Sequence, residues 1–598
     1  MIHFMSATRH HLARSLPATM LLIACLAHAQ PAPEGESGFQ PRPAAVGERF
    51  IAVTAHPAAT DAAAGILRAG GTAVDAAIAA QMVLTLVEPQ SSGIGGGAFL
   101  LHFDGQKVDA FDGRETAPTA ASSDLFLQAD GRPMAFGEAM VGGRSVGTPG
   151  VLRMLELAHR RHGRLPWPDL FAPAIALAER GFPVSHRLHT LLANEQHLQN
   201  DPQARAYFYD AEGKPWPVAY TLQNPALADT LRRIASQGAD AFYTGKLAAD
   251  IVHKVREHNS NPGLLSTSDL EHYRARERTA VCTPYRRWTI CGMPPPSSGG
   301  IAVAQILGLL EGRDMAAQSP QQGVASAEAI HLFSEAGRLA FADRARYVAD
   351  TDFVPLPGKH GDSPAALLAP AYLKQRATLI GTRSMGKAEA GQPLPATPPA
   401  GNERAPERPS TTHLSIVDGE GHAVAMTSSI ENAFGSRLMV NGFLLNNQLT
   451  DFSFVASDAQ GPIANRVEGG KRPRSSMAPT LIFDREQGDL LGVVGSPGGS
   501  QIINYVARTL LAILDWQMDL PAALALPHFG SRNGPTELEQ RGDQPSVALQ
   551  EALKNRGHAL RLQPMTSGIS AIMRIDTATG KRWAGAADPR REGSARGD

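Results

Sequence analysis

The chain has 598 residues, of which 43% are hydrophobic and only 19% charged, so it can bury a large core. It carries 56 basic and 57 acidic residues and a net charge of −1, a balance that provides no basic surface for nucleic acid. A single large α/β body and two tightly joined lobes both fit this length.

The N-terminus has the pattern of an export signal. Basic residues precede an apolar run at residues 16–26, and residues 27–29, Ala-His-Ala, have the small-x-small form of a signal-peptidase site. We therefore expect residues 1–29 to be removed and the mature protein to be periplasmic or secreted. An alternative is a lipoprotein anchored through Cys25, because residues 22–25 resemble a lipoprotein cleavage box. We expect no transmembrane segment in the mature protein, since no other run reaches about 20 apolar residues.

Helical patterns dominate the first half of the mature chain. Residues 30–47 are rich in Pro, Gly and Glu, which predicts a flexible leader. Residues 60–87 have apolar side chains at helical spacing, interrupted by Gly70 and Gly71, and predict two core helices. A strand is expected at residues 98–103, and further helices within residues 151–171, 226–237 and 326–349.

A glycine-rich segment separates the first helices from the first strand. Residues 93–98 fit the G-x-G-x-x-A fingerprint of a dinucleotide site, with Glu115 about twenty residues further on. That fingerprint needs a strand before the glycines and a helix after them, whereas here a helix precedes and a strand follows. We therefore predict a tight turn near a ligand or a catalytic sheet, and no cofactor.

Two histidine pairs, His159 with His162 and His186 with His189, have the i, i+3 spacing of one helix face. Neither pair has a carboxylate near it to complete a metal site, so we interpret these histidines as exposed or capping residues and predict no metal. The chain also lacks the H-E-x-x-H, C-x-x-C and G-x-S-x-G motifs, which removes the usual sequence support for metal-dependent and α/β-hydrolase mechanisms.

Cys282 and Cys291 lie at the ends of a short segment whose pattern predicts a hairpin. In an oxidising periplasm the two thiols could form a disulfide across that hairpin. Two buried free thiols are the alternative.

A Pro-rich segment without regular periodicity, residues 391–410, leads directly into Thr411. A threonine hydroxyl needs a base beside it to act as a nucleophile, and a threonine at a new chain N-terminus has its own α-amino group for this purpose. Cleavage between Ser410 and Thr411 would therefore create an active site. The alternative is that a Thr-Thr pair simply opens a strand, because β-branched residues favour strands.

Strand patterns dominate after Thr411. Residues 414–417 and 423–426 flank the turn-forming residues 418–421 and predict a hairpin. A helix-rich half followed by a strand-rich half indicates sheets covered by helices. Further strands are expected at residues 442–445, 479–483 and 491–494.

Two loops in the second half have residues suited to anion binding. Residues 495–500, Gly-Ser-Pro-Gly-Gly-Ser, follow a strand and precede a helix-like run, so their backbone N–H groups could face an oxyanion. A plain strand-to-helix turn is the alternative. Ser475 and Ser476 lie in a basic segment and could bind a carboxylate with its help, as could Arg114.

In their order and spacing these segments resemble the γ-glutamyltransferase family, also called glutathione hydrolases, within the N-terminal-nucleophile hydrolases. The resemblance extends over nearly the whole mature chain. It rests on Val87–Gly97, Asp112–Pro118, Gly147–Gly150, Met293–Gly300, Thr411–His413, Leu445–Gln448 with Asp451, Ser475–Met477, Gly495–Ser500 and Asp588–Arg590.

The resemblance implies an α+β fold, a four-layer αββα sandwich made as a precursor that cuts itself between Ser410 and Thr411. The products would be a large subunit, residues 48–410 and ending in the linker, and a small subunit, residues 411–598, which together form a heterodimer. Thr411 would then take the γ-glutamyl group from glutathione or a related donor and pass it to water, an amino acid or a peptide. The amides of Gly498 and Gly499 would hold the oxyanion.

Carried over by position, Arg114, Ser475 and Ser476 would bind the α-carboxylate of the substrate. Gln448 and Asp451 would bind its α-ammonium. A zwitterionic amino-acid end needs a cationic, hydroxyl-rich pocket beside an anionic one, which rejects acyl groups lacking either charge.

Three positions depart from the best-known members of the family. Ser429 replaces a threonine whose hydroxyl supports the nucleophile, and it keeps that hydroxyl. Glu431 replaces an asparagine that contacts the substrate amine; a carboxylate there would bind ammonium more strongly or crowd Asp451. The expected lid, residues 452–470, is shorter and has no tyrosine, so a more open site would favour hydrolysis or bulkier donors.

Two other functions compete with this hypothesis. A cephalosporin (glutaryl) acylase of the same fold would use Thr411 on an acyl group without an α-amine, but an unpaired Asp451 in its pocket would be costly. A periplasmic binding protein would keep the amino-acid pocket and never mature. An intact Thr411 with Gly498 and Gly499 argues against it.

Overall fold

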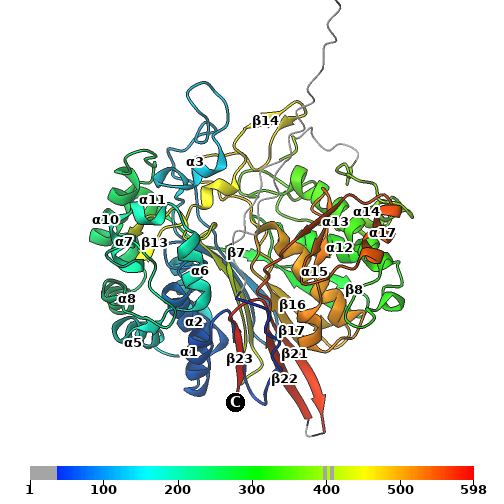
Figure 1. Ribbon diagram of the computed structural model, residues 1–598, viewed down its shortest axis with the longest axis horizontal. Helices are drawn as coiled ribbons and strands as arrows, with labels where there is room; N and C mark the ends of the chain where they lie inside the picture. Colours follow the sequence, from blue (N-terminus) through cyan, green and yellow to red (C-terminus); the bar gives the residue numbers. More distant parts are fainter. Residues whose placement is uncertain (1–36, 395–400, 404–409, 579) are drawn as a thin grey trace, which may run out of the picture. The chain divides into compact units, whose positions relative to one another are not determined.

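Two seven-stranded antiparallel sheets lie face to face, and helices cover the outer side of each, in a computed structural model that describes residues 37–394, 401–403, 410–578 and 580–598 (Figure 1). This arrangement is the αββα sandwich predicted from the sequence. Residues 1–29, with Cys25, and linker residues 395–400 and 404–409 lie outside the described residues.

The first sheet combines strands from both sides of the Ser410–Thr411 bond. The hairpin that follows Thr411 occupies its centre, with one neighbour, β2, near the start of the chain and the other, β3, after the glycine-rich turn. A chain cut before Thr411 would therefore keep its two parts interleaved. The strand order is β23 (Ser594–Gly597), β2 (Ile51–Thr54), β10 (Thr412–Val417), β11 (Ala423–Ser429), β3 (Gly97–Phe103), β4 (Val108–Gly113) and β7 (Arg276–Thr279).

The second sheet contains the disulfide hairpin. Cys282 and Cys291 are directly opposite each other on neighbouring strands, and their sulfur atoms are bonded. The strand order is β1 (Ala45–Gly47), β22 (Gly580–Ala587), β21 (Ser570–Thr577), β17 (Leu490–Gly495), β16 (Thr480–Asp484), β9 (Trp288–Gly292) and β8 (Val281–Tyr285).

Strand β1 falls inside the segment predicted as a flexible leader. It pairs with β22, and the N–H groups of Ser37 and Gln40 donate to the carbonyls of Arg590 and Pro589. Over its described part, residues 37–47, the leader is thus bound to the second sheet. Its Pro and Gly content had indicated mobility. That prediction was wrong for these residues because composition does not reveal a partner strand almost 540 residues away.

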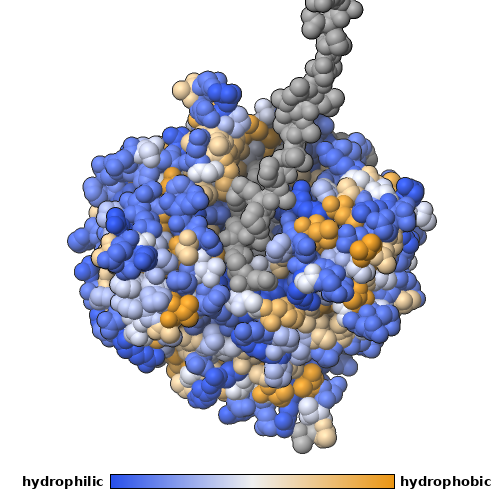
Figure 2. Space-filling view, in the orientation of Figure 1, coloured by the Kyte–Doolittle hydropathy of each residue, from blue (hydrophilic) through white to orange (hydrophobic). Residues whose placement is uncertain are grey.

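Along the strands of the first sheet, successive side chains point alternately to the helix layer and to the space between the two sheets. Leu100 and Ile416 point towards the helices of the first sheet, whereas Phe99 and Leu101 point between the two sheets, as the two-residue period of a strand requires. Figure 2 shows that polar residues predominate on one face of the surface, with apolar residues in small patches. Most large apolar side chains are instead buried in these two cores.

Helices over the first sheet come from the first half of the chain. Thr72 and Asp75 form a capping box at the second of them, so the predicted break at Gly70 and Gly71 separates two helices. They are α1 (Pro57–Arg68), α2 (Ala73–Val87), α4 (Val151–His162), α5 (Ala172–Arg180), α6 (His186–Asn194), α7 (Pro202–Phe208), α8 (Pro225–Gln237), α9 (Asp240–Tyr243), α10 (Gly245–Arg256) and α11 (Thr267–His272).

Helices over the second sheet come from both halves. They are α12 (Gly299–Leu310), α13 (Ala327–Tyr347), α14 (Pro370–Ala377), α15 (Ile502–Leu514), α16 (Leu520–Ala525) and α17 (Val547–Asn555). The glycine-rich segment 93–97 joins helix α2 to strand β3, an order that excludes a dinucleotide fold at this point. Within the described residues, no helix has both the length and the apolarity needed to cross a bilayer.

Candidate active site

Thr411 is buried at the start of strand β10, in the centre of the first sheet. Its Oγ1 donates to the carbonyl oxygen of Ser410 at 2.5 Å. Ser429 ends the neighbouring strand β11, and its Oγ donates to the same carbonyl at 2.7 Å and lies 3.3 Å from Thr411 Oγ1. Two hydroxyl groups therefore meet at the peptide bond predicted to be cut.

A small cavity of about 20 Å³ adjoins Thr411. It brings together residues from separate parts of the sequence, including all six of those predicted to bind substrate. Its lining is Arg114, Thr411, Ser429, Glu431, Gln448, Asp451, Ser475, Ser476, Met477, Gly499 and Ile502. In the uncut chain this space is too small for an amino acid.

The predicted cationic and anionic groups contact each other across this cavity. Arg114 donates to Asp451 Oδ2 at 2.5 Å and also to the backbone carbonyls of Pro473 and Arg474. Gln448 donates its amide to the same Asp451 oxygen at 2.7 Å. The two groups meant for opposite ends of a zwitterion thus neutralise each other in this state.

The serine pair receives its cationic contact from an unexpected residue. Arg344, on helix α13, donates to Ser476 Oγ at 2.8 Å. The basic residues beside the serines bind elsewhere: Lys471 contacts Glu468, and Arg474 forms an ion pair with Glu403. Arg344 is distant from the serines in the sequence, so spacing along the chain could not have revealed its contact with Ser476.

The glycine loop lies where a strand ends and a helix begins. Gly498 and Gly499 have φ of 137° and 56°, follow strand β17 and open the turn into helix α15. Gly499 lines the cavity, whereas Gly498 is absent from its described lining and lies against the ring of Tyr505. Backbone N–H groups at a helix start are suited to binding negative charge.

Glu431 occupies the cavity in a constrained conformation. Its φ is +77°, a value that asparagine adopts more readily than glutamate. The side-chain amide of Asn447 donates to Glu431 Oε2 at 2.5 Å, and the backbone N–H of Glu431 donates to Ser429 Oγ at 2.9 Å. The backbone of residue 431 thus contacts the Ser429 hydroxyl, while the carboxylate introduced by glutamate contacts Asn447.

Two nearby residues were not predicted as part of this site: Arg591, and Glu115, which was considered only as the acidic residue of a dinucleotide fingerprint. Arg591 donates to the backbone carbonyl of Thr411 at 3.2 Å and so helps to position this residue. In the sequence, its only indication of a role was its place directly after the Asp588–Arg590 motif. Glu115 is fully buried, and burial raises its pKa to about 8, although Arg114 lies 3.8 Å away and opposes the shift. Glu115 is thus mostly protonated at neutral pH.

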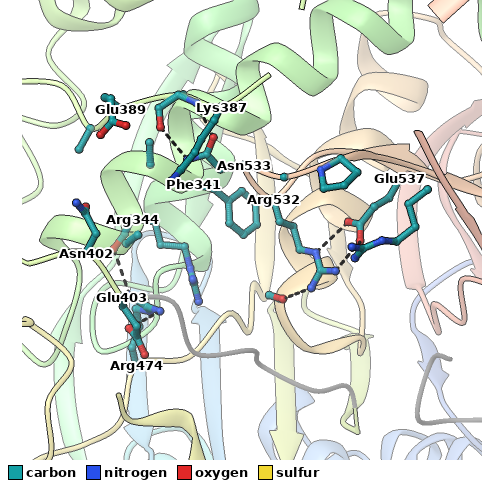
Figure 3. A pocket seen from close by; sticks show the side chains of 18 of the residues that line it. Phe341, Arg344, Lys387, Glu389, Asn402, Glu403, Arg474, Arg532, Asn533 and Glu537 are labelled. Carbon is teal, nitrogen blue, oxygen red and sulfur yellow. Dashed lines mark hydrogen bonds and ion pairs between the residues drawn. The ribbon is translucent and has the colours of Figure 1, made fainter. Parts of the chain in front are cut away.

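A larger cavity of about 520 Å³ lies beside the first (Figure 3). Arg344 and Arg474 belong to its wall, as does Ser500, the neighbour of Gly499. Arg532 forms an ion pair with Glu537 and also donates to Ser500 Oγ. The charged residues that line it are Arg344, Lys387, Arg474, Arg532 and Arg561 against Glu389, Glu403 and Glu537, an excess of positive charge.

Residues 401–403 of the linker are held against the expected lid. Gly401 N–H donates to the carbonyl of Pro462 at 3.0 Å, and Asn465 donates to the carboxylate of Glu403. The lid, residues 452–470, contains the short strands β14 (Ser457–Asp458) and β15 (Gly461–Pro462). In the uncut chain these three linker residues therefore lie directly beside the lid.

The αββα sandwich, with Thr411 at the centre of one sheet, is the fold of the N-terminal-nucleophile hydrolases. Within that class, the chain belongs to the gamma-glutamyltranspeptidase family, which it matches over residues 59–597. It is 36% identical to the glutathione hydrolase proenzyme of Bacillus subtilis (strain 168), over 92% of each chain. Identity to the glutathione hydrolase proenzyme of Escherichia coli (strain K12) is 35%, over 89% of each chain. The crystal structure of a cephalosporin acylase from Bacillus halodurans superposes with a TM-score of 0.78 at 26% identity, covering 93% of this chain and 97% of that one.

Proposed function

We propose that the protein is a γ-glutamyltransferase and glutathione hydrolase that matures by cutting its own chain before Thr411. The observation that carries this proposal is the single cavity lined by Thr411, Arg114 and Asp451. A γ-glutamyl donor has the matching pattern: a zwitterionic amino-acid end a short distance from the amide to be cleaved. Requiring both charges excludes acyl groups that lack either one.

Maturation begins when Thr411 Oγ1 attacks the carbonyl carbon of Ser410. The hydroxyl proton passes to the amide nitrogen as the C–N bond breaks, which leaves an ester on Thr411 Oγ1 and a free α-amine. Water then hydrolyses the ester and leaves a carboxylate on Ser410. The Ser429 hydrogen bond, 2.7 Å to the Ser410 oxygen, supports this route because that oxygen carries the negative charge of the intermediate.

In the mature enzyme the freed α-amine acts as the base. It takes the proton of Thr411 Oγ1 as the oxygen attacks the γ-carbonyl carbon, and it gives the proton to the leaving amine. The amides of Gly498 and Gly499 stabilise the oxyanion. Water, or the amine of an amino acid or peptide, then takes the γ-glutamyl group from Thr411 and restores the hydroxyl.

The donor binds by replacing an existing ion pair. Its α-carboxylate takes the place of Asp451 beside Arg114, with Ser475 and Ser476 as further donors. Its α-ammonium takes the place of Arg114 beside Asp451 and Gln448. Each buried charge therefore keeps a partner, which avoids the cost of an isolated ion.

The larger cavity suits an anionic leaving group or acceptor. The glycine carboxylate of the Cys-Gly part of glutathione would lie among the arginines of this cavity and contact Arg532. We expect Arg532→Ala to raise KM for glutathione about tenfold or more, the loss of one charge-assisted hydrogen bond. KM for γ-glutamyl-p-nitroanilide, whose leaving group is neutral, should stay within about twofold. An equal rise for both donors would instead indicate damage to the shared site.

Two assays test the main proposal. Intact-mass analysis and N-terminal sequencing should find two fragments, the smaller beginning Thr-Thr-His, and only uncut protein in Thr411→Ala. An uncut wild type would favour a non-processing binding protein. The purified enzyme should also turn over γ-glutamyl-p-nitroanilide much faster than glutaryl-p-nitroanilide, and the reverse ranking would favour the cephalosporin acylase alternative.

We also propose that the two products stay together as a heterodimer and act in the periplasm or outside the cell. The interleaving of β10 and β11 between β2 and β3 supports the first point, because the products share one sheet. The Cys282–Cys291 bond supports the second, since disulfides persist in oxidising compartments. Fractionation of cells that express the full chain would test the location and distinguish a free protein from one anchored through Cys25.

A further inference from the structure

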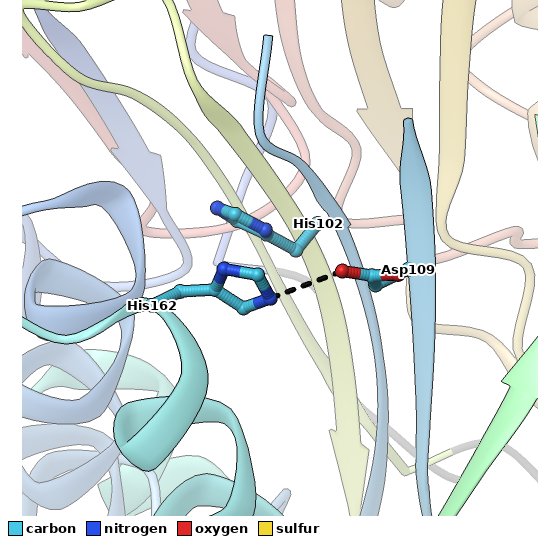
Figure 4. Close-up of side chains that lie close together, drawn as sticks. All are labelled: His102, Asp109 and His162. Carbon is cyan, nitrogen blue, oxygen red and sulfur yellow. Dashed lines mark hydrogen bonds and ion pairs between the residues drawn. The ribbon is translucent and has the colours of Figure 1, made fainter. Parts of the chain in front are cut away.

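Three side chains far from Thr411 in the fold come together where strands β3 and β4 meet helix α4 (Figure 4). His102 and Asp109 are directly opposite each other on the two strands. His162 is the last residue of the helix, and its Nε2 lies 3.1 Å from Asp109 Oδ2. The sequence analysis found no carboxylate near His162 because Asp109 comes from another element.

His102 is an anomaly in this cluster. Its side chain is only 1% exposed, and neither ring nitrogen has a hydrogen-bond partner among the described residues. Buried polar atoms almost always have a partner, so an unsatisfied imidazole requires an explanation. Its ring centroid lies 4.0 Å from that of His162.

A second histidine cluster in the described chain provides a contrast. In His331, Glu335 and His558 every ring nitrogen has a partner: the two histidines bind each other, and their remaining nitrogens bind a backbone carbonyl and the hydroxyl of Thr536. Glu335 accepts from Arg338 and from Ser384. That cluster is a complete hydrogen-bond network and needs no ion.

We propose that His102, Asp109 and His162 bind a divalent transition-metal ion, with Zn²⁺ the best match to two imidazoles and one carboxylate. Their ligand atoms all lie within 4.8 Å of one another. Two ligands on a tetrahedral zinc ion are about 3.3 Å apart, so the His162–Asp109 spacing already fits and His102 needs a small rotation. A fourth position would be open to water.

The surroundings admit an ion from solvent. The side chains of His162 and Asp109 are 15% and 22% exposed, so the site is open to solvent at these two residues, whereas His102 is buried. Lys107 lies 3.0 Å from the other Asp109 oxygen and is itself largely exposed, so it can move away. An ion here would tie the end of helix α4 to the β3–β4 hairpin, which makes its role structural.

Zinc titration of the full, processed protein tests the proposal. After chelator treatment and dialysis, calorimetry with ZnCl₂ should give one site per chain with micromolar or tighter affinity. His162→Ala and Asp109→Asn should each weaken binding at least about 100-fold, since even residues that only support a ligand cost 10- to 100-fold. His186→Ala, an exposed histidine on helix α6, is the matched control and should change affinity less than about twofold.

A spectroscopic measurement keeps the test independent of the variants' stability. CoCl₂ added to the wild type should produce the visible absorption bands of histidine-bound Co²⁺, and one equivalent of ZnCl₂ should remove them. Zinc should also raise Tm of the wild type more than that of either variant. Absence of saturable one-to-one binding in the wild type would overturn the proposal. Binding that survives both substitutions would overturn it too.

Discussion

Gly498→Ala is the most informative single substitution in the glycine loop. Gly498 has φ of 137°, which an L-residue rarely adopts, and a Cβ there would lie 2.5 Å from Cε2 of Tyr505. The Tyr505 ring is buried, and its centroid lies 4.2 Å from that of the tilted His528 ring, so it has little room to move away. The strained dihedral costs about 1–2 kcal/mol and the overlap about 1–3 kcal/mol, or about 2–5 kcal/mol if the loop stays in place.

The loop would release that strain by shifting, and the shift would displace the amides meant for the oxyanion. Losing one such donor typically lowers kcat by about 10²–10³-fold, and we expect this fall for γ-glutamyl-p-nitroanilide hydrolysis by the cleaved fraction of Gly498→Ala. Gly488→Ala is the matched control: its φ is +75°, but no atom lies within 4 Å of the added Cβ. It should keep kcat within about twofold.

A kcat for Gly498→Ala within about threefold of the wild type would refute this reasoning. The double variant Gly498→Ala/Tyr505→Val separates the two causes of strain, because it removes the ring that the new Cβ meets. It should recover part of the lost activity if the collision matters. No recovery would mean that the dihedral angle alone explains the defect.

Three further outcomes follow from the structure. Ser429→Ala removes a donor to the Ser410 carbonyl and should lengthen the half-life of the uncut precursor, followed on denaturing gels, about 100-fold. Ser428→Ala is the control and should process normally, because the Ser428 hydroxyl donates to the carbonyl of Gly97 instead. Burial lowers the pKa of His413 to about 3, so below pH about 6.5 the unfolded chain binds a proton at this residue and the native state does not. The free energy of unfolding, measured by urea titration, should therefore fall by up to about 2 kcal/mol between pH 6.5 and 5. The fall should be smaller in His413→Asn. Converting both cysteines of the β8–β9 hairpin to serine should lower the free energy of unfolding by about 2–3 kcal/mol under oxidising conditions. No loss would show that the disulfide does not restrict the unfolded chain more than the hairpin sequence already does.

Local patterns in the sequence predicted the elements well. Helix α15 spans Ile502–Leu514, directly after the glycine loop, where a helix-like run was predicted, and the hairpin after Thr411 forms as its turn residues indicated. These features depend on interactions between neighbouring residues, which a linear pattern records. The leader was misjudged because β1 exists only through its pairing with β22.

The sequence by itself, through its resemblance to a known family, predicted the αββα fold and indicated Thr411 as the candidate nucleophile with most of the residue types that line its cavity. Only the tertiary structure decided which of these residues meet. Arg114 and Asp451 are 337 positions apart, and Arg344 reaches Ser476 across 132. The His102–Asp109–His162 cluster likewise depends on strand register and on where helix α4 ends. Such contacts arise from packing of distant segments, and no periodicity along the chain encodes them.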